Sequence, residues 1–315
     1  MEVNQTTITQ FLLLGFQYDN NLKPYLFLIF LVAFTLTIFG NLIIIMLVVR
    51  SEALKSPMYF FLSHLSFSDI LLSSTITPKM LDIVKNEGGF INVSDCIAQL
   101  FFYSGTTTAE CLLLTVMSYD RYLAICKPLH YHSIMNFKLQ LLLAIWPWVI
   151  GFLVALLLIM FVCNYKFCGP YIMDHYLCDL APILELTCSD HSVLDIVDFV
   201  LTIPFIIFPL FFIMFTYVSI FLNILKISSS VGRKKAFSTC SSHLIVVSMY
   251  YGTLMNVYMI PSKISSYNIK KLVAPLYTTG TPLLNPIIYS LRNQEIQFAL
   301  NKCIFIYTKR HGLAF

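Results

Sequence analysis

Seven long apolar stretches constrain the fold of this 315-residue chain more than any other feature of its sequence. Hydrophobic residues make up 58% of the chain and charged residues only 11%, whereas a soluble domain carries about a quarter charged residues. A helix needs about 20 apolar residues to cross the hydrocarbon core of a bilayer. The stretches that reach this length are 24–49, 57–83, 96–126, 139–162, 193–225, 236–260 and 269–291.

These stretches predict an all-α membrane protein. Each is continuous, and the sequence lacks the alternating strands of about ten residues that build membrane β-barrels. We therefore expect a seven-transmembrane helix bundle over residues 24–291, preceded by an extracellular N-terminus at 1–23. Residues 292–315 would form a short cytoplasmic amphipathic helix and tail. A soluble protein with buried helices could not supply seven stretches of this length.

The basic residues predict which end of the bundle faces the cytosol, because Lys and Arg gather in cytoplasmic loops. Asn4-Gln5-Thr6 is a glycosylation sequon and fits an outside N-terminus. A second sequon starts at Asn92, but its closeness to a span makes its use less expected. With the N-terminus outside, the inner loops and tail hold most of the 20 Lys and Arg residues: Arg50, Lys55, Arg121, Lys127, Lys138, Lys226, Arg233, Lys234, Lys235, Arg292, Lys302, Lys309 and Arg310.

The cysteines agree with an oxidising outer side. Four of them fall in the predicted outer region, where thiols oxidise, and they allow three disulfide pairings: Cys96, Cys168, Cys178 and Cys188. Three more lie within spans or at their inner ends, where small apolar packing is expected: Cys111, Cys126 and Cys240. Cys303, in the inner tail, could carry a palmitoyl group.

Two acids lie in the middle of predicted spans, Asp69 in the second and Glu110 in the third. Asn41 and Asn285 recur at matching depths, and Pro286 frees a backbone carbonyl beside Asn285. Charged groups inside a membrane are costly and indicate function. The two carboxylates could hold a sodium ion or share a proton. They could equally belong to a hydrogen-bonded network that only joins helices.

Two stripes of residues at helical spacing could line a cavity in the outer half of the bundle. The stripe in the third span contains Leu100, Tyr103, Ser104, Thr107, Thr108 and Cys111, and the one in the sixth contains Tyr251, Leu254, Met255 and Tyr258. Plain helix packing would give the same spacing, so this alternative stays open. Because the upper part of neither stripe carries an acid or base, a ligand bound there would be small, neutral and mostly apolar.

Enzymatic motifs do not stand out. The sequence has no GxSxG, no HExxH and no phosphate-binding glycine loop, and a net charge of +4 gives no basis for nucleic-acid binding. Five histidines lie outside the centres of the spans without the spacing of metal ligands, so we expect them to be solvated or interfacial: His130, His132, His175, His191 and His243.

Motifs along nearly the whole chain resemble those of the rhodopsin-like G-protein-coupled receptors, and within them the odorant receptors. They are Gly40-Asn41, PMYFFLSHLSFSDI (57–70), MSYDRYLAICKPLHY (117–131), KAFSTCSSHL (235–244) and PLLNPIIYSLRN (282–293). Motifs of this length in this order are highly specific, and SPMYFFLSHLSF resembles the class II branch. Departures are mild: Ser118 stands for the usual Ala, Thr216 for Ser and Tyr250 for Phe.

The resemblance implies roles for particular residues. It implies the disulfides Cys96–Cys178 and Cys168–Cys188. It implies that Asn41, Asp69, Glu110 and Asn285 form the polar cluster that can hold sodium, with no other cofactor. The residues that would rearrange when the inner face opens to a G protein are Asp120, Arg121, Tyr122, Tyr217, Asn285, Pro286 and Tyr289.

The resemblance also implies a function. A small volatile odorant would bind among Tyr103, Ser104, Thr107, Thr108, Leu201, Thr202, Phe205, Tyr251, Leu254, Met255, Tyr258 and Thr278. Tyr103 stands where amine receptors carry an Asp, so their ammonium anchor is missing. Binding would activate a heterotrimeric G protein of the stimulatory olfactory type and raise cyclic AMP. The receptor would lie in the plasma membrane of olfactory sensory neuron cilia, surrounded by lipid.

Two other functions compete with this interpretation. A channel or secondary transporter would explain the intramembrane acids as an ion path, but such transporters are built from two repeated halves, and no internal repeat is visible. A receptor of the same fold for a peptide or an amine is opposed by the uncharged upper stripes. The sequence does not name the odorant, because apolar pockets distinguish single methylenes by only ~1–3 kcal/mol.

Overall fold

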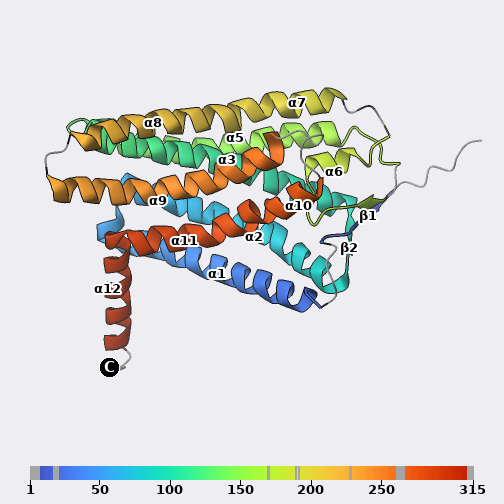
Figure 1. Ribbon diagram of the computed structural model, residues 1–315, viewed down its shortest axis with the longest axis horizontal. Coiled ribbons are helices and arrows are strands. Elements are labelled where there is room, and N and C mark those ends of the chain that lie inside the picture. The colour runs from blue at the N-terminus through green and yellow to red at the C-terminus, as the bar shows by residue number, and fades with distance from the viewer. Residues whose placement is uncertain are drawn as a thin grey trace, which may run out of the picture.

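The structure is a computed structural model that describes residues 8–16, 21–168, 171–188, 190, 192–226, 229–259 and 267–310. Its long helices run side by side as one bundle (Figure 1). They are α1 (Lys23–Arg50), α2 (Pro57–Asn86), α3 (Val93–Cys126), α5 (Phe137–Val162), α7 (Ser192–Thr202), α8 (Phe208–Leu225), α9 (Ser230–Leu254), α10 (Tyr267–Pro275) and α11 (Thr281–Arg292). The π-helical turns η2 (Ile203–Ile207), η3 (Met255–Met259) and η4 (Leu276–Gly280) continue α7, α9 and α10.

Each of the seven predicted spans coincides with one helical run, which confirms the seven-helix bundle. The fifth run is α7–η2–α8, the sixth is α9–η3 and the seventh is α10–η4–α11. Three short helices connect or cap these runs: η1 (Glu52–Leu54), α4 (Tyr131–Ile134) and α6 (Leu180–Leu184). The last helix, α12 (Gln294–Arg310), turns away from the bundle axis after α11 (Figure 1).

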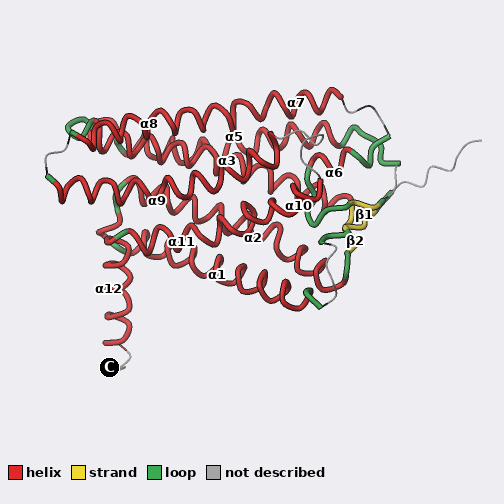
Figure 2. Tube along the Cα trace, viewed as in Figure 1, coloured by secondary structure: helices red, strands yellow, loops and turns green. Residues whose placement is uncertain are grey.

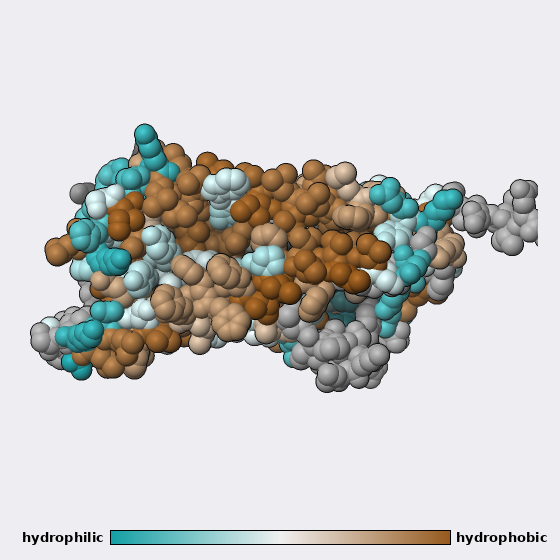
Figure 3. Space-filling model, turned by 90° about the horizontal axis from the view of Figure 1, so that it is seen from above, coloured by the Kyte–Doolittle hydropathy of each residue, from teal (hydrophilic) through white to brown (hydrophobic). Residues whose placement is uncertain are grey.

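Hydropathy separates the helices into two groups. Among the described residues, four segments are by themselves long and apolar enough to cross a membrane: α1, α3, α5 and Ser192–Leu225. The remaining runs include residues such as Asp69, Ser73 and Asn285, which the bundle buries. Polar side chains that face the interior of a bundle lower the hydropathy of a span without exposing it to lipid. On the face that Figure 3 shows, apolar residues cover the middle of the bundle, and hydrophilic residues gather toward its two ends.

A small sheet that the sequence did not predict lies at one end of the bundle (Figure 2). Its strands are β1 (Gln10–Leu13), β2 (Gly89–Asn92) and β3 (Ile172–Met173) in the order β2-β1-β3. β1 pairs antiparallel with β2 and parallel with β3. The sheet ties the N-terminal segment to two loops. We call this end the outer end and the opposite one, where α12 begins, the inner end, following the predicted orientation.

Small residues bring the central helices into close contact. A Cβ atom on Gly151 of α5 would lie 2.4 Å from the backbone oxygen of Gly105 in α3. A Cβ atom on Gly40 of α1 would lie 3.0 Å from Cγ of Pro286 in α11. Small residues that allow backbones to approach are the usual basis of helix packing in membranes, where no hydrophobic driving force joins the helices.

Candidate functional site

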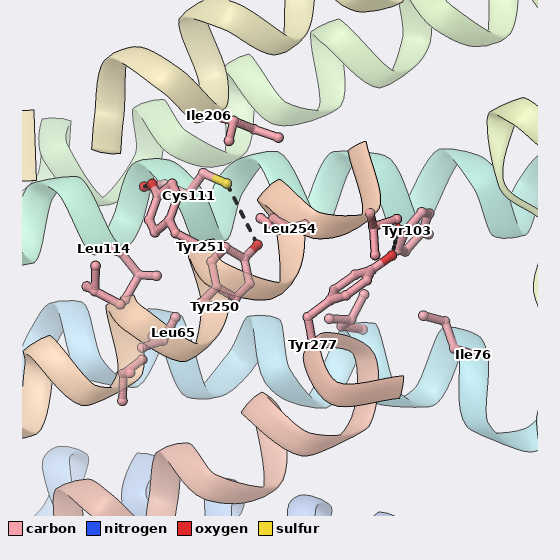
Figure 4. Packing of buried hydrophobic residues seen from close by; sticks show 14 of the residues in the cluster. Leu65, Ile76, Tyr103, Cys111, Leu114, Ile206, Tyr250, Tyr251, Leu254 and Tyr277 are labelled. Carbon is pink, nitrogen blue, oxygen red and sulfur yellow. Dashed lines mark hydrogen bonds between the residues drawn. The ribbon is translucent and has the colours of Figure 1, made fainter. Parts of the chain in front are cut away.

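Three tyrosines from three helical runs meet near the outer end of the bundle. The hydroxyl of Tyr103, in α3, is hydrogen-bonded to those of Tyr258, in η3, and Tyr277, in η4. The hydroxyls of Tyr258 and Tyr277 lie 3.2 Å apart. Figure 4 shows Tyr103 and Tyr277 pointing toward one another between apolar neighbours. Because π-helical turns often occur at functional sites, we treat this tyrosine cluster (Tyr103, Tyr258 and Tyr277) as the centre of the candidate ligand site.

An outer loop covers the tyrosine cluster. Asp179 accepts a hydrogen bond from the Tyr258 hydroxyl at 3.1 Å, and its other oxygen accepts from the backbone N–H of Leu180 at 2.8 Å. The neighbouring Cys178 forms a disulfide with Cys96, with Cα atoms 5.4 Å apart. The backbone N–H of Cys178 donates to Gln99 at 2.8 Å. Helical periodicity did not predict Asp179, because this residue lies in a loop and belongs to neither stripe.

The other predicted ligand residues lie on α3, α7–η2, α9–η3 and η4. Tyr251 and Leu254 are buried on α9, and the Tyr251 hydroxyl donates to the carbonyl of Cys111 at 3.0 Å. The Thr107 hydroxyl is buried without a hydrogen-bond partner. The hydroxyls of Ser104 and Thr108 donate to carbonyls within α3, at 2.7 and 2.9 Å. Leu201, Phe205 and Met255 are partly buried, Thr278 is buried, and the side chain of Thr202 lies outside the described residues.

The structure joins two residues of the predicted polar cluster, Asp69 and Asn285, by hydrogen bonds. Asn285 donates to both carboxylate oxygens of Asp69, at 3.0 and 2.9 Å. Asn41 donates to the carbonyl of Pro282 at 3.1 Å, which joins α1 to α11. Glu110 is buried, and its Oε1 has no hydrogen-bond partner.

The donor set of this cluster fits a hard cation. Three buried oxygens of the predicted cluster have no hydrogen-bond partner: those of Asn41, Glu110 and Asn285. Carboxylate and amide oxygens are ligands that hard cations prefer, so these residue types are compatible with a sodium ion. Within the described part of the chain, no group of three or more His, Cys, Asp or Glu side chains is placed to hold a metal ion.

At the inner end, Asp120 is hydrogen-bonded to Tyr131, a residue to which the sequence assigned no role. Asp120 is 1% exposed and accepts a hydrogen bond from the hydroxyl of Tyr131, in α4, at 2.7 Å. Its predicted partner Arg121 is farther away, with 4.0 Å between Nε and Oδ2. Burial and the Asp120 carboxylate raise the pKa of Tyr131 above its usual value, so this phenol remains a donor. Tyr122 is half-buried beside this pair.

A second inner contact links α8 to α9. The hydroxyl of Tyr217 lies 2.7 Å from Nδ1 of His243, and the two rings stack with centroids 5.6 Å apart. Both residues are buried, so the prediction of a solvated or interfacial His243 was wrong. The histidine faces inward because it lies at helical spacing on the buried face of α9, together with Cys240, Val247 and Tyr250. Tyr289 is buried with an unpartnered hydroxyl, and Pro286 packs against Gly40.

His175, in the outer loop, is the second histidine that was wrongly predicted to be solvated or interfacial. His175 is 6% exposed and stacks on Tyr176 with ring centroids 4.8 Å apart. Burial and, secondarily, the Lys271 ammonium lower the pKa of His175 to about 4. Lys271 forms an ion pair with Asp174 at 2.5 Å, which ties this loop to α10. His130 and His132 are exposed, and His191 lies outside the described residues.

The remaining predicted positions lie at the outer surface. Cys168 and Cys188 form a disulfide, with Cα atoms 5.6 Å apart. Cys163, at the outer end of α5, is a free and exposed cysteine. Asn4 lies outside the described residues, and Asn92 is exposed at the end of β2.

These features define a seven-transmembrane receptor, with a candidate ligand site at one end of a helix bundle and buried charges at the other. The model of the olfactory receptor family matches residues 26–306. Olfactory receptor 6B1 of Homo sapiens is 42% identical over 307 residues, covering 98% of both chains. Olfactory receptor 9G19 of Mus musculus is 41% identical over 304 residues, covering 96% of this chain and 100% of the relative. The chain therefore belongs to the olfactory receptor family, a family of receptors rather than of enzymes.

Proposed function

We propose that this chain is an odorant receptor whose ligand is small, neutral and mostly apolar and binds around the tyrosine cluster. The observation that carries the proposal is the meeting of three phenol hydroxyls from α3, η3 and η4 in apolar surroundings. A ligand with one hydrogen-bonding group can take over one of these bonds. Its apolar remainder would gain about 25 cal/mol per Å² of surface removed from water.

Ligand binding would act on the inner end through the helices that carry the cluster. Tyr258 and His243 lie on the same helical run, α9–η3, and Tyr277 and Asn285 lie on η4–α11. A ligand that separates the tyrosines favours another packing of these runs and shifts the population toward it. A sodium ion bound by Asp69, Glu110 and the neighbouring neutral oxygens would favour the packing without ligand.

The partner of the shifted state would be a heterotrimeric G protein of the stimulatory olfactory type, which raises cyclic AMP. Moving α9 away from α8 would break the contact between Tyr217 and His243 and free Arg121 from Asp120. The opened inner end would then receive a helix of the G protein, a common mode of recognition by a groove. We place the receptor in the plasma membrane of olfactory cilia, with its N-terminus outside.

Cyclic AMP measurements in cells test this proposal. Cells would express the full chain with an N-terminal surface tag, with or without the olfactory stimulatory α subunit, and receive a panel of neutral volatiles. We expect a concentration-dependent rise in cyclic AMP that requires the α subunit. A chain that reaches the surface but responds to no volatile, or conducts ions in response to one without any G protein, would contradict the proposal.

A further inference from the structure

A cavity of about 470 Å³ lies at the outer end of the bundle, away from the tyrosine cluster. It is formed between α2 and α3 below β2, and none of the predicted ligand residues lines it. Its volume falls within the range of about 300–1,000 Å³ that is typical of small-molecule sites. The residues used below are Pro78 and Lys79 of α2, Phe90 of β2, and Asp95, Gln99 and Phe102 of α3.

In the predicted orientation, the cavity lies close to the depth of the outer lipid headgroups. Lys79 is four residues before the end of the predicted span 57–83, or about 6 Å along a helix. This distance matches the thickness of the headgroup layer on each side of the hydrocarbon core, which is about 5–8 Å. Phe90 and Phe102 are 57% and 42% exposed, and aromatic residues collect at the membrane interface. A molecule in this cavity would therefore have a head among polar groups and a tail in lipid.

The cavity is lined by one basic and one acidic side chain, Lys79 and Asp95, and Lys79 is also ion-paired with Asp82 beside the cavity. Lys79 donates hydrogen bonds to Asp82 at 2.7 Å and to the carbonyl of Phe90 at 2.8 Å. An ammonium group has three donors, so a third remains for an anionic oxygen. On the α3 side, the exposed Asp95 accepts from Asn92 at 2.9 Å. A carboxylate with aromatic rings nearby suits a quaternary ammonium group.

The floor of the cavity is fixed in place. Gln99 is 7% exposed. It donates to the carbonyl of Thr75 in α2 at 2.9 Å and accepts from the backbone N–H of Cys178 at 2.8 Å. Both ends of this side-chain amide are therefore used within the protein, and the cavity can keep its shape when the lipid around it moves.

We propose that this cavity binds the phosphocholine head of an outer-leaflet phospholipid. The phosphate accepts a hydrogen bond from Lys79, and the choline group packs against Phe90 and Phe102 beside Asp95. The acyl chains leave along the exposed faces of Pro78 and Phe102. Asp95 disfavours a lipid with a net negative charge, because its carboxylate would then face an unbalanced anion. This site is separate from the proposed odorant site and does not depend on it.

Photocrosslinking tests the proposal on the full-length receptor in detergent micelles, to which each lipid is added separately. The probe is a phosphatidylcholine with a photoreactive diazirine near its headgroup, and labelled sites are located by peptide mapping. We expect labelling to concentrate on residues 90–102 and to be displaced by unlabelled phosphatidylcholine more strongly than by phosphatidylglycerol. Lys79→Gln should reduce this labelling by on the order of tenfold, as the loss of a hydrogen bond between charged groups implies.

Two further variants separate binding from folding. Ala98→Trp fills the cavity from an exposed position without removing a polar group, and it should also abolish labelling of residues 90–102. Lys85→Gln removes an exposed charge on the same helix outside the cavity, and it should leave labelling unchanged. Labelling that neither Lys79→Gln nor Ala98→Trp reduces would overturn the proposal. Equal displacement by phosphatidylglycerol, or labelling spread evenly over the lipid-facing helices, would also overturn it.

Discussion

At the scale of single residues, the inner end depends on the hydrogen bond from Tyr131 to Asp120. This carboxylate is 1% exposed, and its Oδ2 has no hydrogen-bond partner. Burying a charged group is costly unless it is paired and hydrogen-bonded. At 4.0 Å, Arg121 gives Asp120 an ion pair but no hydrogen bond. Tyr131 therefore stabilises the arrangement seen here more directly than Arg121 does.

We predict that Tyr131→Phe raises cyclic AMP in the absence of ligand. Loss of a hydrogen bond to a charged group costs about 1.5–3 kcal/mol, and this cost falls on the arrangement in which Asp120 is buried. Basal cyclic AMP at matched surface expression measures the effect. Tyr119→Phe, one residue before Asp120 in α3, is the control and should leave the basal level unchanged. Equal basal levels in both variants and the wild type would show that Tyr131 has no such role.

His175 predicts a dependence of stability on pH. Its pKa is about 4 in the folded state because of burial and the nearby Lys271 ammonium, and about 6.5 in an unfolded chain. Between these values the unfolded state binds more protons, so the stability contributed by His175 is complete above about pH 6.5. It is lost as the pH falls toward about 4. The expected loss between pH 7 and pH 5 is on the order of 2 kcal/mol.

Thermal unfolding of the purified receptor at these two pH values measures this loss. His175→Gln should reduce the difference in Tm between pH 7 and pH 5, whereas His132→Gln, at an exposed inner position, should preserve it. A difference that is the same with and without His175 would mean that other groups cause it.

At the scale of elements, the spans were predictable and their irregular parts were not. Hydropathy placed the ends of α1 and α5 within two residues of their observed positions, because a continuous apolar stretch marks where a chain can cross a membrane. The turns η3 and η4 were missed, because π-helical geometry leaves no mark in hydropathy. The sheet was missed because Phe11 pairs with Ile91, far along the chain.

Part of the candidate site was predictable, namely the residues that repeat at helical spacing within one span. The stripes on the third and sixth spans found Tyr103 and Tyr258 through helical periodicity. Periodicity within one segment does not predict how distant segments pack. It therefore could not show that Tyr277 and Asp179 join the site, or that His243 is buried. The resemblance to the receptor family named Thr278 but not its neighbour Tyr277.

Close packing of α3 against α5 gives a prediction for two glycines. Gly151→Ala would put a Cβ atom 2.4 Å from the backbone oxygen of Gly105, and a backbone atom cannot move aside easily. We expect a loss of about 1–3 kcal/mol in stability, as for other overpacked cores, and reduced surface expression. Gly252→Ala in α9 is the matched control, because a Cβ atom there meets nothing within 4 Å. It should have a normal or higher Tm, since alanine favours helix. A Gly151→Ala receptor as stable as the wild type would refute this packing.

At the scale of the whole molecule, the two ends of the bundle share their helices. The run α9–η3 carries His243 at the inner end, Tyr251 in the middle and Tyr258 in the tyrosine cluster. The run η4–α11 carries Tyr277, then Asn285 against Asp69, then Tyr289. Coupling requires an element with two arrangements that both sites bias, and these two runs are the candidates for it.

The concentration dependence of cyclic AMP in Tyr103→Phe receptors tests the central claim most directly, with an active volatile and the olfactory α subunit present. The Tyr103 hydroxyl is bonded to both Tyr258 and Tyr277, so its removal costs about 1–3 kcal/mol at about 0.5–1.5 kcal/mol per hydrogen bond. We therefore predict that the half-maximal concentration changes by about 5- to 150-fold while surface expression is preserved. Tyr171→Phe, at an exposed outer-loop position, is the control. If Tyr103→Phe and Tyr171→Phe both respond as the wild type does, the tyrosine cluster is not the ligand site.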